Sequence, residues 1–411
     1  MSEIKQGYKQ TKVGIIPEDW EDIKIKDIVK VSQGLQIAID DRFTTYTDNR
    51  VFYITIPFIE GKKEEYIENP KSSILCKKDD ILVVRTGSGV GKIIRGVEGA
   101  FHNNFFKVKP SNNINIDFFY YILTSPKIQF LMAKYAGNST IPDLNHGDFY
   151  SLDFLIPSLK EQEKIAEILT TWDEAITKQT ELLEAKELLK KALMQKLLSG
   201  KVRFTGFSDE WKEVILGDIG KAFNGLSGKT GEDFGIGESK YITYKNIFDN
   251  SKIKLNIFDN VQIFNDEKQN LVQFGDIFFT VSSETPEEVG MSSVLLDNVS
   301  NTYLNSFCFG YRLHNFNTLD PHYARFYFRS FQMRDKISRL AQGSTRFNLS
   351  KNEIMKLKVY LPSLVEQQKI TEVLSLADDE INLLKNELEE LKLQKKALMQ
   401  KLLTGEVRVK V

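Results

Sequence analysis

Hydrophobic residues recur at alternating steps of four and three positions in two long segments of the chain. The first series, apolar at seven of ten positions, is Ile165, Leu169, Trp172, Ile176, Gln179, Leu183, Lys186, Lys190, Leu193 and Leu197. The second, apolar at nine of ten, is Ile370, Leu374, Ala377, Ile381, Leu384, Leu388, Leu391, Lys395, Leu398 and Leu402. This spacing predicts two amphipathic helices with a coiled-coil seam. Proline precedes and glycine follows each segment, at Pro157 and Gly200 and at Pro362 and Gly405. Each helix should therefore have about 40 residues.

The two helical segments are copies of one sequence. A shift of 205 residues aligns 156–204 with 361–409 without a gap, and 26 of the 49 positions are identical. A leucine stripe at helical spacing is equally compatible with ordinary core packing, but two like helices in one chain can also pair with each other. Because a globular domain lies between them and has to be bridged, antiparallel pairing is the simplest arrangement. We expect an antiparallel coiled coil with pseudo-twofold symmetry.

The remainder of the chain is predicted to form two α+β domains, each a mixed sheet with short helices. The continuous apolar runs at 81–85 and 277–281 are typical of buried strands, and 118–125 and 322–330 are typical of short helices lying on such a sheet. Similar segments led by Trp20 and Trp211 open the two domains. We expect a globular domain at 1–155, a spacer helix at 156–204, a second globular domain at 205–360 and a second spacer helix at 361–411.

Composition limits the possible functions. The 55 Lys and Arg residues are balanced by 56 Asp and Glu residues, so the chain as a whole does not attract phosphate. No apolar run approaches the roughly 20 residues that span a bilayer, which predicts a cytoplasmic protein without a membrane partner. Cys76 and Cys308 form no C-x-x-C pair and the four histidines have no metal spacing. We expect no metal, no cofactor and no catalytic residues.

The helix-opening motifs IPSLKEQEKI and LPSLVEQQKI, the Ser-Thr turns before them and the Trp-led segments resemble the type I restriction-modification specificity subunit. The resemblance covers nearly the whole chain and implies a non-catalytic protein that binds double-stranded DNA. Each globular half would be a target-recognition domain for one part of a split target, and the helix pair would set the spacing. The helices would also dock two adenine-N6 DNA methyltransferase subunits, which motor-nuclease subunits would join.

In the first half, a loop with two cations and three glycines follows the strand at 81–85. Glycines allow close approach to phosphate, and an arginine can fork onto guanine or phosphate. The loop does not fit a Walker A motif, because Ile93 stands where a Ser or Thr would hold magnesium. A plain hairpin turn is the alternative. The DNA-binding candidates here are Arg85, Thr86, Ser88, Lys92, Asn103 and Asn104, with Lys107 nearby.

The segments before the two long helices give further candidates, Ser139 and Thr140 in the first half and Ser344, Thr345, Arg346 and Asn348 in the second. Hydroxyl, guanidinium and amide groups suit phosphate anchoring and base reading, although a turn or helix cap explains a Ser-Thr pair equally well. Ile141 replaces Arg346 in the first half. The other candidates in the second half are Lys245, Asn246, Ser282, Ser283 and Asn305, near an acidic loop that would repel phosphate.

A second hypothesis is a coiled-coil scaffold that joins two protein-binding domains and has no role on DNA. The balanced charge supports it. The two hypotheses differ in the predicted affinity for duplex DNA. Phosphate contacts would make this affinity fall steeply with salt, whereas a scaffold without a role on DNA would show no salt-dependent affinity.

Overall fold

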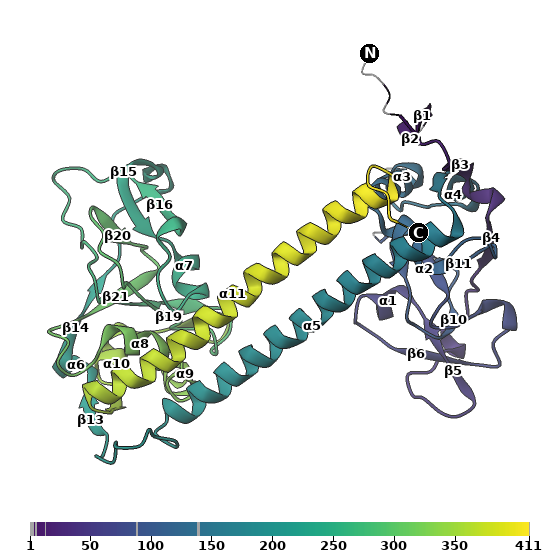
Figure 1. Ribbon diagram of the computed structural model, residues 1–411. Helices are drawn as coiled ribbons and strands as arrows, with labels where there is room; N and C mark the ends of the chain where they lie inside the picture. Colours follow the sequence, from purple (N-terminus) through teal and green to yellow (C-terminus); the bar gives the residue numbers. More distant parts are fainter. Residues whose placement is uncertain (1–3, 5, 13, 88, 138–139, 411) are drawn as a thin grey trace. The chain divides into compact units, whose positions relative to one another are not determined.

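The computed structural model describes residues 4, 6–12, 14–87, 89–137 and 140–410. The chain divides into two compact units (Figure 1), unit 1 with Met1–Thr180 and Asn386–Val411 and unit 2 with Glu181–Lys385. Two long helices, α5 (Leu159–Leu197) and α11 (Leu364–Leu403), match the predicted lengths with 39 and 40 residues. Each unit therefore holds one half of each long helix.

Unit 1 contains two four-stranded sheets. The first is antiparallel, with the order β4 (Val29–Gln33), β11 (Phe105–Pro110), β8 (Ile81–Val84), β9 (Ile93–Ile94). The second is mixed, with the order β6 (Glu65–Glu68), β5 (Arg50–Ile54), β10 (Gly99–Phe101), β7 (Leu75–Cys76). Two-stranded pairs are formed by β1 (Tyr8–Thr11) with β2 (Gly14–Pro17) and by β3 (Glu21–Lys24) with β12 (Asp153–Ile156). All four residues of β8 are buried, as a continuous apolar strand requires.

Short helices cover the first sheet of unit 1, and polar residues fix where they begin. They are α2 (Ile116–Thr124), α3 (Pro126–Ala136) and α4 (His146–Tyr150), and α1 (Ile56–Ile59) follows β5. Asn115, Ser125 and Asn145 accept backbone hydrogen bonds as their N-caps. The predicted strand at 81–85 and helix at 118–125 are confirmed.

Unit 2 repeats this architecture. Its antiparallel sheet has the order β14 (Gly220–Asn224), β21 (Cys308–Leu313), β17 (Ile277–Thr280), β19 (Ser292–Val294). A mixed sheet has the order β16 (Phe258–Val261), β15 (Phe234–Ile242), β20 (Thr302–Leu304). Two further pairs are β13 (Lys212–Ile215) with β23 (Lys358–Leu361) and β18 (Ser282–Ser283) with β22 (Phe347–Asn348). The helices are α6 (Leu216–Ile219), α7 (Tyr244–Asp249), α8 (Pro321–Tyr327), α9 (Phe331–Arg339) and α10 (Lys351–Met355).

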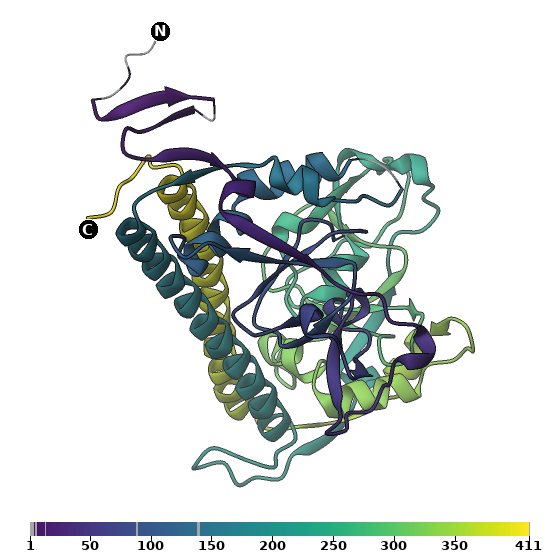
Figure 2. The same ribbon diagram turned by 90° about the vertical axis from the view of Figure 1, so that its right-hand side faces the viewer.

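The two long helices pair in antiparallel orientation within each unit, as Figures 1 and 2 show. In unit 1, Lys395 forms an ion pair with Asp173, and Gln179 Nε2 donates to Glu387 Oε2 at 3.0 Å. In unit 2, Lys186 contacts Glu380 at 2.6 Å and Lys190 forms an ion pair with Asp378. Partner numbers on α11 fall as numbers on α5 rise, so the predicted antiparallel pairing is confirmed. Every apolar residue of the two predicted seams is buried or partly buried.

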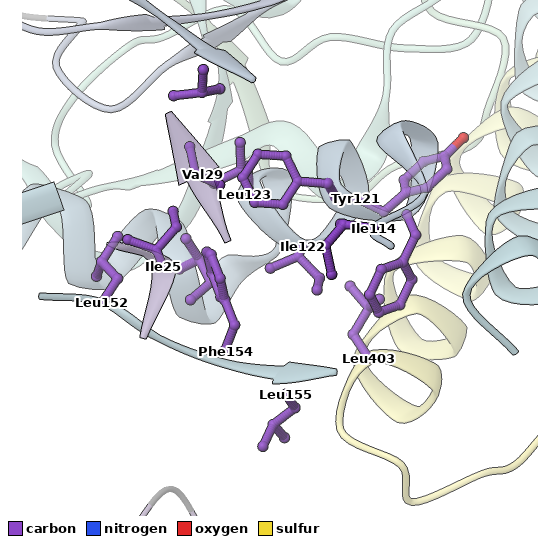
Figure 3. Close-up of a cluster of buried hydrophobic side chains, with 14 of the residues drawn as sticks. Ile25, Val29, Ile114, Tyr121, Ile122, Leu123, Leu152, Phe154, Leu155 and Leu403 are labelled. Atoms are coloured by element: carbon purple, nitrogen blue, oxygen red, sulfur yellow. The ribbon is translucent and has the colours of Figure 1, made fainter. Parts of the chain in front are cut away.

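Each globular core includes the last turns of a long helix that follows the other domain in sequence. In unit 1 the core extends onto Met399, Leu402 and Leu403 of α11, and Figure 3 shows Leu403 among the apolar side chains of the α2 region. In unit 2, Leu197 at the end of α5 and the following Leu198 belong to the core cluster that includes residues of β17 and α8. The ends of the helices are thus held by the domains as well as by each other.

A buried glutamate in the first turn of each long helix binds an arginine that follows the other long helix. The Glu161 side chain, 1% exposed, accepts hydrogen bonds from Arg408 Nε and Nη2 at 2.7 and 2.8 Å and from Trp20 Nε1 at 3.1 Å. Glu366, also 1% exposed, accepts from Arg203 at 2.8 and 2.7 Å. Two parallel N–H···O bonds to a carboxylate are strong and geometrically specific. We call these contacts the helix-end ion pairs.

The glutamine after each of these glutamates ties the helix to its own domain. Gln162 Oε1 accepts from the backbone N–H of Asn115 at 2.9 Å, and Gln367 Oε1 accepts from that of Asp320 at 2.9 Å. Asn115 and Asp320 are the N-caps of α2 and α8. The Glu-Gln dipeptide repeated in the two motifs therefore fixes both the helix pairing and the position of the adjoining domain.

We expect Arg408→Ala to weaken unit 1. The substitution leaves Glu161 as a buried charge whose side chain has only the Trp20 N–H as a partner. We expect a cost of about 2–3 kcal/mol, which is moderate for a buried charge because solvent reaches the position of the arginine. Hydrogen exchange should become faster in the last turns of α11 and in β3. Arg339→Ala is the control, since Arg339 forms an exposed pair with Asp335 on one helix and should cost below about 0.5 kcal/mol. Equal hydrogen-exchange rates in the two variants would contradict the role of Arg408 in stabilising unit 1.

Candidate nucleic-acid interface

In unit 1 the loop after β8 pairs with the segment that precedes α4. Thr86 forms an antiparallel bridge with Asp143, and Gly87 N–H donates to Pro142 O at 3.0 Å. Arg85 N–H donates to Asn104 O at 2.7 Å. The structure therefore brings three predicted regions together, namely the glycine-rich loop, the Asn103-Asn104 turn and the segment that precedes α4. Ser88 and Ser139 lie outside the described residues.

The charge on Arg85 is neutralised inside the unit. Its Nε and Nη2 donate to the two carboxylate oxygens of Asp143 at 2.9 and 3.2 Å. Burial, followed by the nearby Arg85 guanidinium, lowers the pKa of His146, which lies three residues beyond Asp143. Arg85 thus holds the loop against the segment that precedes α4, and Lys92 is the exposed cation of the loop.

The other predicted residues of unit 1 differ in their surroundings. Thr140 is exposed, and Thr86 and Asn104 are partly exposed. Asn103 Oδ1 is buried and accepts no hydrogen bond from the described residues. Lys107 Nζ donates to Leu75 O at 2.8 Å and lies 3.4 Å from Asp80. Lys107 is therefore committed to contacts within the fold, which does not fit its prediction as a DNA contact.

In unit 2 the equivalent loop lines a groove. Ser282 pairs with Asn348 and Ser283 with Phe347, so the loop after β17 and the segment before α10 again lie side by side. The groove has a volume of about 660 Å³ and is lined by Tyr244, Phe248, Ser282, Ser283, Glu284, Glu288, Phe307, Thr345 and Arg346. Four of the residues predicted from sequence therefore meet in one concave site, and Ser344 and Asn348 are exposed next to it.

The groove has an aromatic wall and a polar wall. The rings of Tyr244 and Phe248 stack with centroids 5.9 Å apart, and Tyr244 Oη donates to Ser282 O at 2.9 Å. Burial raises the pKa of Tyr244, so its hydroxyl remains a donor. On the polar wall, Ser283 Oγ donates to Glu288 Oε2 at 3.1 Å. Arg346 forms no ion pair with any described residue.

Sequence reasoning missed the aromatic part of this site. Phe307 is exposed beside Asn305, whose side chain accepts from the Phe307 N–H at 2.8 Å and so holds the turn. The signal available in the sequence was a phenylalanine directly after the polar pair Asn305-Ser306. Nothing in the linear sequence brings Tyr244 and Phe248 close to it, because they come from α7.

Two residues of α7 that were predicted to contact DNA make other interactions in the fold. Asn246 is fully buried, and its amide bonds both the N–H and the C=O of Lys254 at 3.0 and 2.8 Å. The prediction that Asn246 faces DNA does not fit this burial, and we correct it to a structural role. Lys245 is exposed and forms an ion pair with Asp249 at 2.6 Å.

No three His, Cys, Asp or Glu side chains among the described residues are placed to hold a metal ion. Cys76 and Cys308 are free and buried. Within the same part of the chain, no helix combines the length and the hydrophobicity that a membrane span requires.

The fold defines a class of protein: two copies of an α+β domain, each with a loop-built surface, on a shared antiparallel helix pair. Residues 17–187 and 208–393 match the family model of the type I restriction modification DNA specificity domain, and the chain belongs to this family. It is a type I restriction-modification specificity subunit, the non-catalytic member of such systems.

Relatives of known assignment match the chain over nearly its full length. The type I restriction enzyme MjaVIII specificity subunit of Methanocaldococcus jannaschii is 25% identical over 99% of this chain and 97% of its own length. The putative type I restriction enzyme MjaX specificity subunit of that organism is 27% identical over 99% and 98%.

Solved structures share the fold. The S subunit of a type I restriction-modification system from M. genitalium is 18% identical, covers 93% of this chain and 96% of its own, and has a TM-score of 0.54. A chain from a structural study of complex assembly and conformational transition of the type I R-M system is 16% identical, covers 95% and 99%, and has a TM-score of 0.61.

We expect Asn246→Ala to destabilise unit 2 by about 2–3 kcal/mol, because it leaves the N–H of Lys254 without a partner and removes one of the two hydrogen bonds that the Lys254 C=O accepts. Thermal unfolding followed by circular dichroism measures the change. Lys245→Ala, one residue earlier and exposed, should shift stability by less than about 0.5 kcal/mol. A normal melting temperature combined with lost DNA binding in Asn246→Ala would restore the original interpretation of Asn246 as a DNA contact.

Proposed function

We propose that the chain binds a bipartite DNA target, with one half-site on each unit, and that the helix pair fixes the distance between the half-sites. One observation carries the proposal. Both units place the loop after the central strand (β8 or β17) beside the segment that precedes α4 or α10, yet the exposed side chains there differ. A repeated framework with unlike surfaces suits the reading of two unlike half-sites.

The groove of unit 2 has the chemistry of base readout. The exposed Arg346 guanidinium can fork onto a guanine edge or a phosphate, and the hydroxyls of Ser282 and Thr345 can donate to either. Phe307 offers an apolar contact for a thymine methyl group. The carboxylates of Glu284 and Glu288 disfavour phosphate at this point, which suits contacts with base edges.

The proposed contact surface of unit 1 offers less positive charge, because Arg85 is paired with Asp143. Lys92, Thr86 and Thr140 are the proposed contacts with phosphate or base edges, next to the Asn103-Asn104 turn. Arg85 is proposed to act through its ion pair with Asp143, as a positioning residue for the loop.

Recruitment of the catalytic partners is the second part of the proposal. The helix pair would dock two adenine-N6 methyltransferase subunits, and motor-nuclease subunits would join this core in the cytoplasm, where the DNA lies. Methylation, ATP hydrolysis and cleavage would take place in those partners. The support is family membership together with a long helix pair that both units share.

We expect the affinity of the complex with its methyltransferase subunits for duplex DNA to fall steeply as salt rises. Arg346→Ala should reduce this affinity by about 5- to 30-fold, equivalent to about 1–2 kcal/mol. Fluorescence anisotropy with a target duplex at several salt concentrations measures both effects. Arg339→Ala is the control, because Arg339 is an exposed arginine of α9 that does not line the groove. Absence of any salt-dependent affinity would favour the scaffold hypothesis.

Deletion of the gene should abolish adenine methylation at one split motif in the genome. Complementation with a chain altered at Ser283 and Arg346 should change or weaken methylation at one half of that motif and leave the other half unchanged. Long-read methylome sequencing gives the result. Loss of specificity in both halves from these substitutions in unit 2 would contradict the assignment of one half-site to each unit.

A further inference from the structure

Opposite charges share the groove of unit 2 without neutralising each other. Arg346, Glu284 and Glu288 all line it and are all exposed, yet none of them forms an ion pair with any described residue. Burial is the main cause that raises the pKa of Tyr244, and the Glu288 carboxylate and the Arg346 guanidinium add smaller effects of opposite sign. Both charges therefore act on the same hydroxyl in the groove while remaining apart from each other.

The turn that carries Arg346 is held in place by its own backbone. Gln342 N–H donates to Asn348 O at 3.0 Å, and Asn348 N–H donates to Gln342 O at 2.8 Å. Gly343 has a φ of +133°, and a Cβ at this position would lie 2.1 Å from the backbone oxygen of Arg346. Only glycine permits so close an approach. The backbone of Arg346 is thus fixed by a closed turn.

The acidic loop that carries Glu288 is held by a guanidinium that binds backbone groups. Arg334 of α9 donates to the backbone oxygens of Glu287, Val289 and Gly290 at 2.8, 2.5 and 2.5 Å. Burial lowers the pKa of Arg334 to about 10, so this side chain stays charged at neutral pH. Because these bonds go to the main chain, Arg334 fixes the path of the loop and leaves its carboxylates available for other contacts.

A second arginine holds the aromatic part of the groove. Arg329 Nη2 donates to the backbone oxygens of Ile247, Phe248 and Asn250 at the end of α7, at 2.7, 2.8 and 2.9 Å. The same helix carries Tyr244, whose ring stacks with that of Phe248. The two arginines thus fix the main chain on both sides of the groove lining, so its charged groups are presented in a defined arrangement.

A guanidinium and a carboxylate that are kept apart suit a ligand with acceptors and a donor side by side. The G·C base pair has this pattern in the major groove, where guanine N7 and O6 accept and cytosine N4 donates. An A·T pair fits less well, because a guanidinium fork requires two adjacent acceptors and adenine N7 is followed by the N6 donor. Phosphate has acceptors only, and the carboxylates repel it.

We infer that the groove of unit 2 recognises one G·C base pair from the major groove, with Arg346 bound to guanine N7 and O6 and Glu288 accepting from cytosine N4. Glu288 is favoured over Glu284 because Ser283 Oγ donates to its carboxylate at 3.1 Å and orients it. The inference rests on the proposed function, because it presumes that unit 2 binds a half-site. In unit 1, Ile141 stands at the position of Arg346, so this contact is confined to unit 2.

Binding of modified duplexes by the complete complex with its methyltransferase subunits tests the inference. Each G·C pair of the methylated motif is replaced in turn by A·T and by inosine·cytosine, and affinity is measured by fluorescence anisotropy. At one G·C pair, A·T should weaken wild-type binding by about 10- to 100-fold. Inosine·cytosine at that pair should bind like G·C, because inosine keeps N7 and O6 and lacks only the amino group in the minor groove.

Two substitutions should remove this preference for G·C. Arg346→Ala should reduce the effect of A·T at that pair to below about threefold, with the effects at pairs in the other half of the motif unchanged. Glu288→Gln should weaken binding of the G·C duplex and narrow the ratio, because a neutral amide accepts less strongly from cytosine N4. Glu287→Gln is the matched control, since Glu287 is exposed in the same loop but does not line the groove. Melting temperatures should equal that of wild type, because the substituted side chains are exposed.

The outcomes separate the inference from the proposed function. If the wild-type complex shows no salt-dependent affinity for DNA, the proposed function itself fails. If it binds a bipartite target but Arg346→Ala weakens all duplexes by the same factor, Arg346 binds phosphate and the base assignment is overturned. A preference that Arg346→Ala removes at an A·T pair, or a loss with inosine as large as that with A·T, also overturns it. If Glu288→Gln tightens binding of all duplexes equally, the carboxylate only repels phosphate and its role on cytosine is wrong.

Discussion

The helix-end ion pairs are the contacts on which the architecture depends. Each joins the first turn of one long helix to an arginine in the segment after the other. Glu161 with Arg408 and Glu366 with Arg203 thus close the antiparallel pairing within their units. A buried carboxylate without its arginine costs more than most single packing contacts. Such pairs also reject a parallel pairing, because only antiparallel helices place the start of one beside the end of the other.

This constraint separates the parts of the molecule that must match from those that are free to differ. The motif around Glu161 and Gln162 has to be repeated, since it holds both the partner helix and the N-cap of a domain helix. The loops after β8 and β17 do not hold the long helices, and their structural role is limited to pairing with the segments that precede α4 and α10. They can therefore carry an Arg-Asp pair in one unit and an aromatic-walled groove in the other, as the proposed recognition of two unlike half-sites requires.

Individual contact residues were harder to predict than the framework. Asn246, Lys107 and Arg85 are residue types that bind nucleic acid, yet in the fold they satisfy backbone groups or carboxylates. The sequence does not distinguish a polar side chain that forms hydrogen bonds inside the fold from one that binds a ligand. Conversely, the groove of unit 2 depends on Phe307 and Tyr244, which lie far apart in the sequence and meet only in the folded unit.

The two long helices, their duplication, their antiparallel pairing and the α+β class of the domains could be predicted from the sequence, because helical periodicity and internal repeats are local and linear signals. The tertiary structure alone decided which charges are neutralised and which side chains share a groove. Those properties depend on neighbours far apart in the chain, such as Glu161 and Arg408, and no spacing along the sequence encodes their distance.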